Sequence, residues 1–587
     1  MKLMCMMLSL TMVASCGDDD DPIAGITDTG ESDGGDEGSN ETSGELVTVS
    51  APDFSGFSIA QSTASTGETT AEPASRAQSV TVTFKEDGTA ETSDANLVTI
   101  SGQAVTASTA GVNYILTGST AEGSSAAFNY KGTGDCTITL NGVSLNTVAK
   151  AIGATTGGNV ELVVNGSNSI TATKKKAIEV GDDTEGSEIY QKLDIYGSGV
   201  LSVTAAAKGA ISSTDAMTVN KGVVLNVTVG ADATGKKGIK SDVSIDFRGG
   251  RTTVVNSAPA TWDDTEGDYS AATCVKAPAV SVSGGTVQCL ATGNGGKGIR
   301  ADNTMTVSDG AVEVITTGSN LVRVSDADKV VTMSQLDSYS SYEDANPKGI
   351  HVGDKDATPA TGNLTISGGK VKVKAVNSEG IESKMYMTVT GGTVEAYAGD
   401  DAINVGISSE NNTGNAYAGK GKIDIRGGRI FAFSTDNDAI DANGTISISG
   451  GVVVASGNTA PECGFDCDQS TFAITGGYVF GIGGDTSSPT ESSCTQSSLI
   501  TSMTVSEGDV VTLQAGGTTV LKAEMPRSYS SARVLVSTPE MKKGASYALL
   551  RGGSTAASGS LSSSQYVNGS AGGNGGGGGF MPGPGRP

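Results

Sequence analysis

The 587-residue sequence has few aromatic residues and almost no histidine. Aromatic residues make up 4% of the chain, with a single tryptophan, and His351 is the only histidine. One histidine excludes mechanisms that need a histidine pair and zinc sites built on three histidines. Residues 80–485 contain no Gly-x-Ser-x-Gly nucleophile elbow, and the sequence contains no nucleotide-binding loop. Catalysis is therefore poorly supported, and we interpret His351 as a solvated residue.

Positive charge is also scarce. The chain has 38 Lys and Arg against 64 Asp and Glu, which gives a formal net charge of -26. This balance argues against nucleic acid or an anionic membrane surface as a partner, because phosphates are repelled. A polyuronate is repelled as well, unless a divalent cation or a local basic patch mediates the contact.

Long apolar runs are missing after the first fifteen residues. Residues 1–15, MKLMCMMLSLTMVAS, are too short to span a bilayer and predict a removable lipoprotein signal peptide. Val13 to Cys16 fit a lipobox, so we expect Cys16 to carry the lipid; an ordinary signal peptide cut elsewhere is the alternative. The acidic run Asp18 to Asp21 is typical of lipoproteins exported to the outside of the outer membrane, or is only a solvated charge run. We expect an outer-membrane lipoprotein, exposed at the cell surface and held by its lipid alone.

Composition divides the rest of the chain. Residues 16–79 are acidic and rich in Ser and Thr, and we expect a disordered tether. Short strand signals fill residues 80–485, which we expect to form one domain. Residues 486–560 predict a small C-terminal β cap, and residues 561–587 a disordered Gly-rich tail.

The segment 80–485 is an internal repeat with two anchors. One anchor is a small residue followed by an apolar one, as at Ala177-Ile178 and Ala402-Ile403. The other is a glycine pair that ends a short strand, as in VSVSGG, LTISGG and MTVTGG. Consecutive pairs recur after 23 residues from Gly368 to Gly391, which is about the length of one turn of three short strands. The pattern predicts an all-β fold, a single-stranded parallel β-helix or β-solenoid, whose coils stack at about 4.8 Å.

The residue that directly follows each apolar anchor should point outward, and these residues should stack into a column along successive coils. The column is basic in the early coils and acidic in the late ones. Crowded carboxylates cannot all stay ionised without counter-charge, and Ca²⁺ accepts the irregular oxygen ligands of such turns. The alternative is a hydrated acidic face without an ion. The candidate Ca²⁺ ligands are Glu379, Glu382, Asp400, Asp401, Asp436, Asp438, Asp441, Asp466 and Asp468.

Two further groups are candidate contacts for a sugar chain. A spaced row of cations suits the carboxylates of a linear polyuronate, although it can equally be a solubilising surface. Two aromatic residues in an insertion can stack on sugar rings, or can pin their own loop to the body. The row comprises Lys237, Lys240, Lys297, Arg300 and Lys348, and the aromatic residues are Trp262 and Tyr269.

From about Val98 to Gly484 the chain resembles the calcium-associated carbohydrate-binding β-helix proteins of bacterial surfaces, which bind cellulose and pectin-type polysaccharides. The resemblance is carried by SGQAVTASTAGVNYILTGS, CTITLNGVSL, AKAIGATTGGNVELVVNGSNSI, the DAI-type coils with GG turns and the C-terminal Gly tail. It implies a right-handed, pectate-lyase-like β-helix, Ca²⁺ in acidic turns and binding without catalysis. By this resemblance, the ion sites fall on Asp400, Asp401, Asp436, Asp438 and Asp441. Coils that carry KGI depart from the pattern.

We therefore expect a monomeric surface lipoprotein that binds polysaccharide, either a pectin-type polyuronate or a cellulose-like glycan, with the help of Ca²⁺. Two alternatives stay open. One is a Ca²⁺-dependent polysaccharide lyase with Arg300 or Lys348 as base. The other is a structural stalk or adhesin without glycan specificity.

Overall fold

The computed structural model describes residues 46–184, 186, 188–332, 335, 343–409, 414–468, 471–561 and, for the backbone, 566–569. The predicted signal peptide, lipidated Cys16 and nearly all of the Gly-rich tail lie outside these residues. The chain divides into units 1–43 and 44–587, and the second is described here. None of its described helices has the length and apolar character needed to cross a bilayer.

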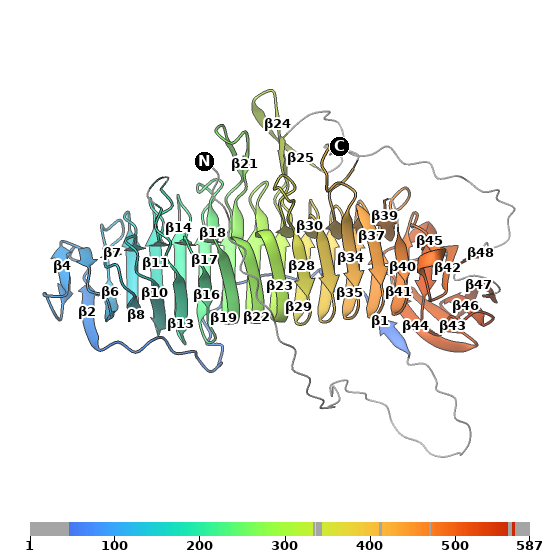
Figure 1. Cartoon of the computed structure of the whole chain (residues 1–587), viewed down its shortest axis with the longest axis horizontal. Helices are drawn as coiled ribbons and strands as arrows, with labels where there is room; N and C mark the ends of the chain where they lie inside the picture. Colours follow the sequence, from blue (N-terminus) through green and yellow to red (C-terminus); the bar gives the residue numbers. More distant parts are fainter. Residues whose placement is uncertain are drawn as a thin grey trace, which may run out of the picture. The chain divides into compact units, whose positions relative to one another are not determined.

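Most described strands belong to one 38-stranded sheet, in which they recur in threes and pair with their equivalents in the next row (Figure 1). The first set of strands comprises β9 (Ile152–Ala154), β12 (Ile178–Val180), β15 (Ile211–Ser213), β18 (Lys237–Ser241), β27 (Ile350–Val352), β30 (Ile381–Ser383), β33 (Ile403–Val405), β36 (Ile440–Ala442) and β39 (Phe465–Cys467). The second comprises β10 (Val160–Asn165), β13 (Leu193–Gly197), β16 (Met217–Val219), β28 (Asn363–Ile366), β31 (Tyr386–Val389), β34 (Gly421–Ile425), β37 (Gly444–Ile448) and β40 (Phe472–Ile474). The third comprises β11 (Ser167–Ala172), β14 (Val200–Ala205), β17 (Val224–Val229), β29 (Lys370–Ala375), β32 (Thr393–Ala398), β35 (Arg429–Ser434), β38 (Val452–Ser456) and β41 (Tyr478–Gly483).

Long strands, end strands and inserted hairpins complete the fold. The long strands are β8 (Cys136–Thr147), β19 (Ser244–Asn256), β22 (Thr273–Ala291) and β23 (Lys297–Thr316). The N-terminal strands are β1 (Val47–Val49), β2 (Gln78–Phe84), β3 (Ala90–Thr92), β4 (Val98–Ser101), β5 (Ala104–Ala107), β6 (Val112–Ser119) and β7 (Ala127–Tyr130). The insertions hold β20 (Thr261–Asp263), β21 (Asp268–Ser270), β24 (Asn320–Val324), β25 (Ala327–Val331) and β26 (Glu343–Ala345). The C-terminal elements are the 3-10 helix η1 (Glu491–Ser493), β42 (Ser498–Val505), β43 (Val510–Ala515), β44 (Thr518–Glu524), β45 (Tyr529–Ser537), β46 (Ser546–Arg551), β47 (Ser554–Ser560) and β48 (Tyr566–Gly569).

The fold is all-β, but the prediction of a right-handed, single-stranded, pectate-lyase-like β-helix is wrong. The pairings close on themselves, because β8 pairs with both β10 and β11, and β19 pairs with both β16 and β17. With β13 and β14 between them, these strands form a closed parallel β-barrel of eight strands, and many further strands surround it.

The closure has a local cause in the two long strands. Residues 136–141 of β8 pair with β10, and residues 144–147 of the same strand pair with β11. The glycine pair of SIDFRGG, which we interpreted as a strand end, bends β19 without ending the strand, and Gly142 bends β8 in the same way. Gly142 and Gly250 adopt φ of 69° and 71° inside β8 and β19, a conformation open to glycine at low cost.

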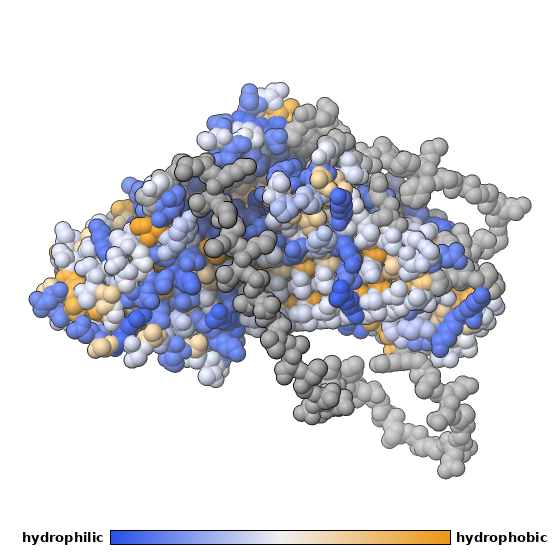
Figure 2. All heavy atoms as spheres, viewed as in Figure 1, coloured by the Kyte–Doolittle hydropathy of each residue, from blue (hydrophilic) through white to orange (hydrophobic). Residues whose placement is uncertain are grey.

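The apolar anchors form a continuous buried column, as the repeat predicted. Each anchor is the register partner of the next, and each is at most 2% exposed. The column comprises Ile178, Ile211, Ile239, Val275, Ile299, Ile350, Ile381, Ile403, Ile440 and Phe465. Residues that directly follow the anchors therefore form a second column beside it. On the face that Figure 2 shows, hydrophilic residues predominate, with small hydrophobic areas between them.

The second half of the predicted tether is not a free chain. β1 pairs in parallel with β44, at the edge of a five-stranded sheet with β43, β46 and β47. Residues 53–76, here called the strap, then run back over other strands. Lys372 Nζ donates to Asp53 O at 3.0 Å, and Gln61 Nε2 donates to Val227 O at 3.2 Å. Polar and backbone contacts hold this segment together with the buried side chains of Phe54 and Ile59, and its composition as a whole did not predict this.

Candidate functional site

The predicted outward column exists and changes from basic to acidic along the chain. Its members are register partners on successive strands of the first set and the long strands: Ser212, Lys240, Lys276, Arg300, His351, Glu382, Asn404, Asp441 and Asp466. Sequence reasoning missed Lys276, because its anchor is Cys274-Val275 rather than an Ala or Gly followed by Ile. Counting cysteine as a small residue finds it.

Three carboxylates meet at the acidic end of the column. One oxygen each from Asp441, Asp466 and Asp468 lies within 4.8 Å of the others. Asp441 comes from β36, whereas Asp466 lies on β39 and Asp468 directly follows that strand. Ser487 Oγ donates to Asp466 Oδ1 at 3.0 Å and thereby fixes its carboxylate. We call these three residues the carboxylate cluster.

Asp441 is the most constrained member of the carboxylate cluster. Its Oδ2 accepts hydrogen bonds from the side chains of Asn404 and Asn443, each at 3.2 Å. Its Oδ1 is buried and has no hydrogen-bond partner among the described residues. Burial, together with the charges of Asp438 and Asp466, raises the pKa of the Asp441 carboxyl well above its ordinary value. A buried carboxylate oxygen without a donor is costly, unless a proton or a cation compensates it.

Other predicted acidic ligands lie near the carboxylate cluster, and burial or hydrogen bonds from asparagine side chains fix some of them. Asp401 and Asp438 are 5% and 8% exposed, and burial with neighbouring carboxylates raises the pKa of both well above the ordinary value. Asp401 Oδ2 accepts from Asn404 Nδ2 at 2.8 Å. Asp400 Oδ1 accepts from Asn437 Nδ2 at 2.7 Å. Asp436 is exposed, and its charge raises the pKa of Tyr397, whose burial is the larger cause.

The structure separates Glu379 and Glu382 from the carboxylate cluster and pairs them with cations. Lys348 Nζ lies 2.7 Å from Glu379 Oε1 and 2.8 Å from Glu382 Oε2. Burial alone raises the pKa of Glu382, but Lys348, Lys384 and His351 together lower it well below its ordinary value. These two glutamates have their counter-charge within the protein, so neither needs a metal ion.

His351 is not the solvated residue that the sequence suggested. It is 9% exposed, with Nδ1 at 2.5 Å from Glu382 Oε2 and Nε2 at 3.1 Å from Gly353 O. Burial lowers the pKa of the His351 imidazole to about 4, against the opposing effect of Glu382. The ring therefore belongs to the buried polar network around Lys348.

The cations of the predicted row already have partners within the protein. Lys240 Nζ lies 2.8 Å from Asp242 Oδ1, and Arg300 Nε lies 2.7 Å from Asp302 Oδ1. Lys237 Nζ donates to Gly235 O at 2.7 Å. Together with the buried Lys348, these contacts leave little of the row available to the carboxylates of a polyuronate.

Lys297 is a buried cation of the row, like Lys348. It is 8% exposed, and its Nζ donates to Asn346 O at 2.7 Å. Burial, with a contribution from the charge of Lys348, lowers the pKa of Lys297 to about 7. The pKa of Lys237 is likewise lowered to about 7 by burial and then by Lys276. Both amines thus lose much of the positive charge that a sugar carboxylate would need.

Trp262 and Tyr269 pack against each other rather than presenting free rings. They face one another across the hairpin β20–β21, with ring centroids 5.3 Å apart in an edge-to-face arrangement. Arg323 Cζ lies 4.4 Å from the Trp262 ring centroid. Tyr269 is 6% exposed, and its hydroxyl donates to Asp328 Oδ1 at 2.7 Å. The geometry favours the pinning of the two insertions to each other over sugar stacking.

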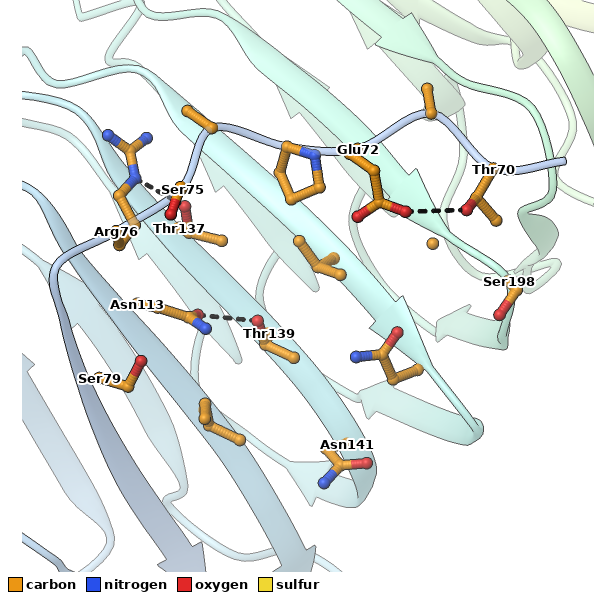
Figure 3. Close-up of a pocket in the computed structure, with 17 residues that line it drawn as sticks. Thr70, Glu72, Ser75, Arg76, Ser79, Asn113, Thr137, Thr139, Asn141 and Ser198 are labelled. Carbon is orange, nitrogen blue, oxygen red and sulfur yellow. Dashed lines mark hydrogen bonds between the residues drawn. The ribbon is translucent and has the colours of Figure 1, made fainter.

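Sequence reasoning also missed a polar groove beneath the strap, because residues 70–76 were assigned to the tether. It has a volume of about 680 Å³ and is lined by strap residues and by strands of the second set with their long-strand neighbours (Figure 3). The outward Asn and Thr residues at matching points of VNYIL, CTITLN and VELVVN were a signal that could have located its floor.

Comparisons with known proteins place this geometry in a family. A model for carbohydrate-binding domain-containing proteins matches the chain twice, over residues 101–354 and 350–544. No curated protein and no solved structure gives a significant match. The two family matches meet near residue 350, where the outward column changes from basic to acidic, and together they span most of the chain. The protein therefore belongs to the family of carbohydrate-binding domain-containing proteins.

Proposed function

We propose that the protein binds a polysaccharide at the bacterial cell surface through Ca²⁺ held by the carboxylate cluster. The observation that carries this proposal is the convergence of Asp441, Asp466 and Asp468 within 4.8 Å. Family membership supports carbohydrate binding in general, and the cluster supplies a way for a chain of net charge -26 to contact a sugar that is itself acidic.

The residues present fit a hard divalent cation. All three side chains offer carboxylate oxygens, which are the ligands that Ca²⁺ prefers in proteins. The buried Oδ1 of Asp441 has no donor among the described residues, so a cation satisfies an atom that the protein leaves uncompensated. A bound Ca²⁺ supplies positive charge and open positions for sugar oxygens. The role of the protein is to hold the anionic side chains in place: Asn404 and Asn443 hold Asp441, and Ser487 holds Asp466.

The sugar that suits this site is a pectin-type polyuronate, whose carboxylates can contact the ion, or a cellulose-like glycan that contacts it through hydroxyls. We propose binding without catalysis. We further propose a monomer that is anchored in the outer membrane through a lipid on Cys16. The sequence of residues 1–21 supports this location.

Affinity electrophoresis through immobilised polygalacturonate and cellulose derivatives, in Ca²⁺ and in chelator, tests the function. We expect retention in Ca²⁺ that disappears in chelator and in the Asp468→Asn variant. The Asp356→Asn variant is the matched control, because Asp356 is exposed, outside the cluster and paired only with Lys355 at the surface. Retention that is equal in chelator, or unchanged by Asp468→Asn, contradicts the proposal. Ultraviolet absorbance from unsaturated uronate, appearing on incubation with polygalacturonate, indicates a lyase instead.

A further inference from the structure

The groove beneath the strap is held open by contacts at both of its ends. On one side, Glu68 Oε2 accepts from the backbone N–H groups of Gly222 and Gly250, at 2.8 and 2.5 Å. On the other side, Arg76 Nη2 lies 2.7 Å from Glu161 Oε2. Between these anchors, residues 70–73 make no hydrogen bond to the sheet within the part of the chain that the structure describes. The strap therefore crosses the strands without closing onto them, and the groove lies in that gap (Figure 3).

The floor of the groove presents amide and hydroxyl groups in register. Asn141 on β8 and Asn165 on β10 are register partners, so their exposed side chains stand about one strand spacing apart. Neither side chain has a hydrogen-bond partner among the described residues. Nearby on the floor of the groove, Asn113 Oδ1 accepts from Thr139 Oγ1 at 2.7 Å, which orients the Asn113 amide (Figure 3). An oriented amide can both donate to and accept from a sugar hydroxyl.

Two apolar side chains lie among these polar groups. Ile115 and Val163 are the register partners of Thr139 on the two adjacent strands, and both line the groove. A sugar ring has hydroxyls at its edge and C–H groups on its faces, so a floor of mixed amides and aliphatic groups matches both. The volume of about 680 Å³ lies within the range of about 300–1,000 Å³ that is usual for small-molecule sites. A short oligosaccharide segment fits this size and chemistry.

The charge of the lining selects against an acidic sugar. Arg76 is the only cation that lines the groove, and it is already paired with Glu161 and hydrogen-bonded to Thr137 Oγ1 at 2.8 Å. Glu72 adds a negative charge to the strap side. A uronate carboxylate would therefore meet no available counter-charge in the groove, and it would be repelled by a strongly negative chain.

We propose that this groove is a second carbohydrate site, which binds a short segment of neutral polysaccharide without Ca²⁺. The proposal rests on the proposed glycan binding for its ligand class, but it uses different residues. Most of the lining strands lie within the first family match, 101–354, whereas the strap residues and Ser79 that complete the lining precede it, and the carboxylate cluster lies within the second match, 350–544. The two sites therefore share no residue: one is for neutral sugar and the other depends on the ion.

Isothermal titration of the full chain in chelator tests the second site. The probes are neutral tetramers of glucose and mannose, with tetragalacturonate as the acidic counterpart. We expect at least one neutral tetramer to bind and tetragalacturonate to give no signal. The double variant Asn141→Ala/Asn165→Ala should weaken that binding about ten-fold, because two hydrogen bonds to the sugar are lost. Asn363→Ala is the matched control, since Asn363 is an exposed strand residue outside the groove.

The outcomes separate the two sites. Neutral binding that the double variant weakens, while Asn363→Ala and Asp468→Asn leave it unchanged, supports a separate groove site. Binding that is equal in the double variant and wild type overturns the assignment, as does the failure of every neutral tetramer to bind in chelator. Loss of Ca²⁺-dependent retention in Asp468→Asn reports on the carboxylate cluster alone, so either proposal can fail while the other stands.

Discussion

Lys348 and Glu382 form a buried ion pair, with 2.8 Å between Nζ and Oε2, beside the point where the outward column changes from basic to acidic. The side chain of Glu382 is 2% exposed. Burial lowers the pKa of Lys348 and raises that of Glu382. Glu379 and then Glu382 raise the pKa of Lys348 above its ordinary value, and Lys348 with Lys384 and His351 lowers that of Glu382 below its ordinary value, so both are charged at neutral pH. The pair therefore ends the basic half of the column without leaving either charge unpaired.

Replacing this lysine should be costly. Lys348→Met leaves Glu379 and Glu382 buried with one fewer cation, and breaking a buried pair in this way costs about 3–5 kcal/mol. Urea unfolding at pH 7 measures the loss. The exposed Lys420→Met is the control, with an expected change within about 0.5 kcal/mol. A midpoint for Lys348→Met equal to that of the control contradicts a structural role for the pair.

The buried aspartates at the acidic end of the outward column should stabilise the fold at low pH, whereas a salt-bridged carboxylate stabilises a fold at higher pH. The pKa values of Asp401, Asp438 and Asp441 are raised above the ordinary 3.8, so the native state binds more protons than the unfolded state. In chelator, their contribution to stability is complete below pH 3.8 and is lost as pH rises through the raised native values. The proposed Ca²⁺ should offset the loss, because a bound cation favours ionised carboxylates.

Urea midpoints measured against pH, with Ca²⁺ and with chelator, check this sign. The two curves should separate as pH rises, and Asp441→Asn should bring them together. Curves that coincide at every pH for the wild type indicate that the acidic residues are stabilised without an ion.

The single tryptophan reports directly on the aromatic insertion. Because Tyr269 and Arg323 contact the Trp262 ring, we expect its fluorescence to stay unchanged when a saturating glycan is added. Trp262→Phe should likewise keep the wild-type affinity. A fluorescence change that saturates together with binding shows instead that the sugar reaches this hairpin.

Stacked glycine turns should tolerate no side chain. Gly392 has φ of 75°, and a Cβ there would lie 2.6 Å from Gly368 O in the row below. Gly392→Ala combines this clash with a left-handed conformation that costs about 1–2 kcal/mol by itself. Gly88→Ala is the matched control, because its φ is 88° but no atom lies within 4 Å of the added Cβ. Urea unfolding should show a clearly larger loss for Gly392→Ala, and equal losses contradict close stacking.

The sequence was sufficient to predict which residues share a column. The small-apolar anchor repeats in step with the strands, so Ile381 stands over Ile350 and Asp466 stands beside Asp441 as expected. It was not sufficient to predict the closed barrel. Whether Gly142 and Gly250 end a strand or only bend it depends on backbone hydrogen bonds to the neighbouring rows, which composition does not encode.

Side-chain pairing was the other limit of sequence reasoning. Lys348 reaches Glu379, 31 residues away, so the cation and acid columns neutralise each other at their junction. From residue types alone, Lys348 was predicted to bind a sugar and Glu379 to bind Ca²⁺. The strap was missed for a related reason, since Glu68 and Arg76 hold it through polar contacts inside a segment with the composition of a disordered linker.

The parallel pairing of β1 with β44 determines where tension enters the molecule. Val47, Thr48 and Val49 are bonded in register to Leu521, Lys522 and Ala523, more than four hundred residues later. A pull exerted ahead of residue 46 is therefore carried by the C-terminal five-stranded sheet before it reaches the strap and β2. Such a load acts along β1 and must break its hydrogen bonds to β44 first. The strands from β2 onward bear the load only after those bonds have broken.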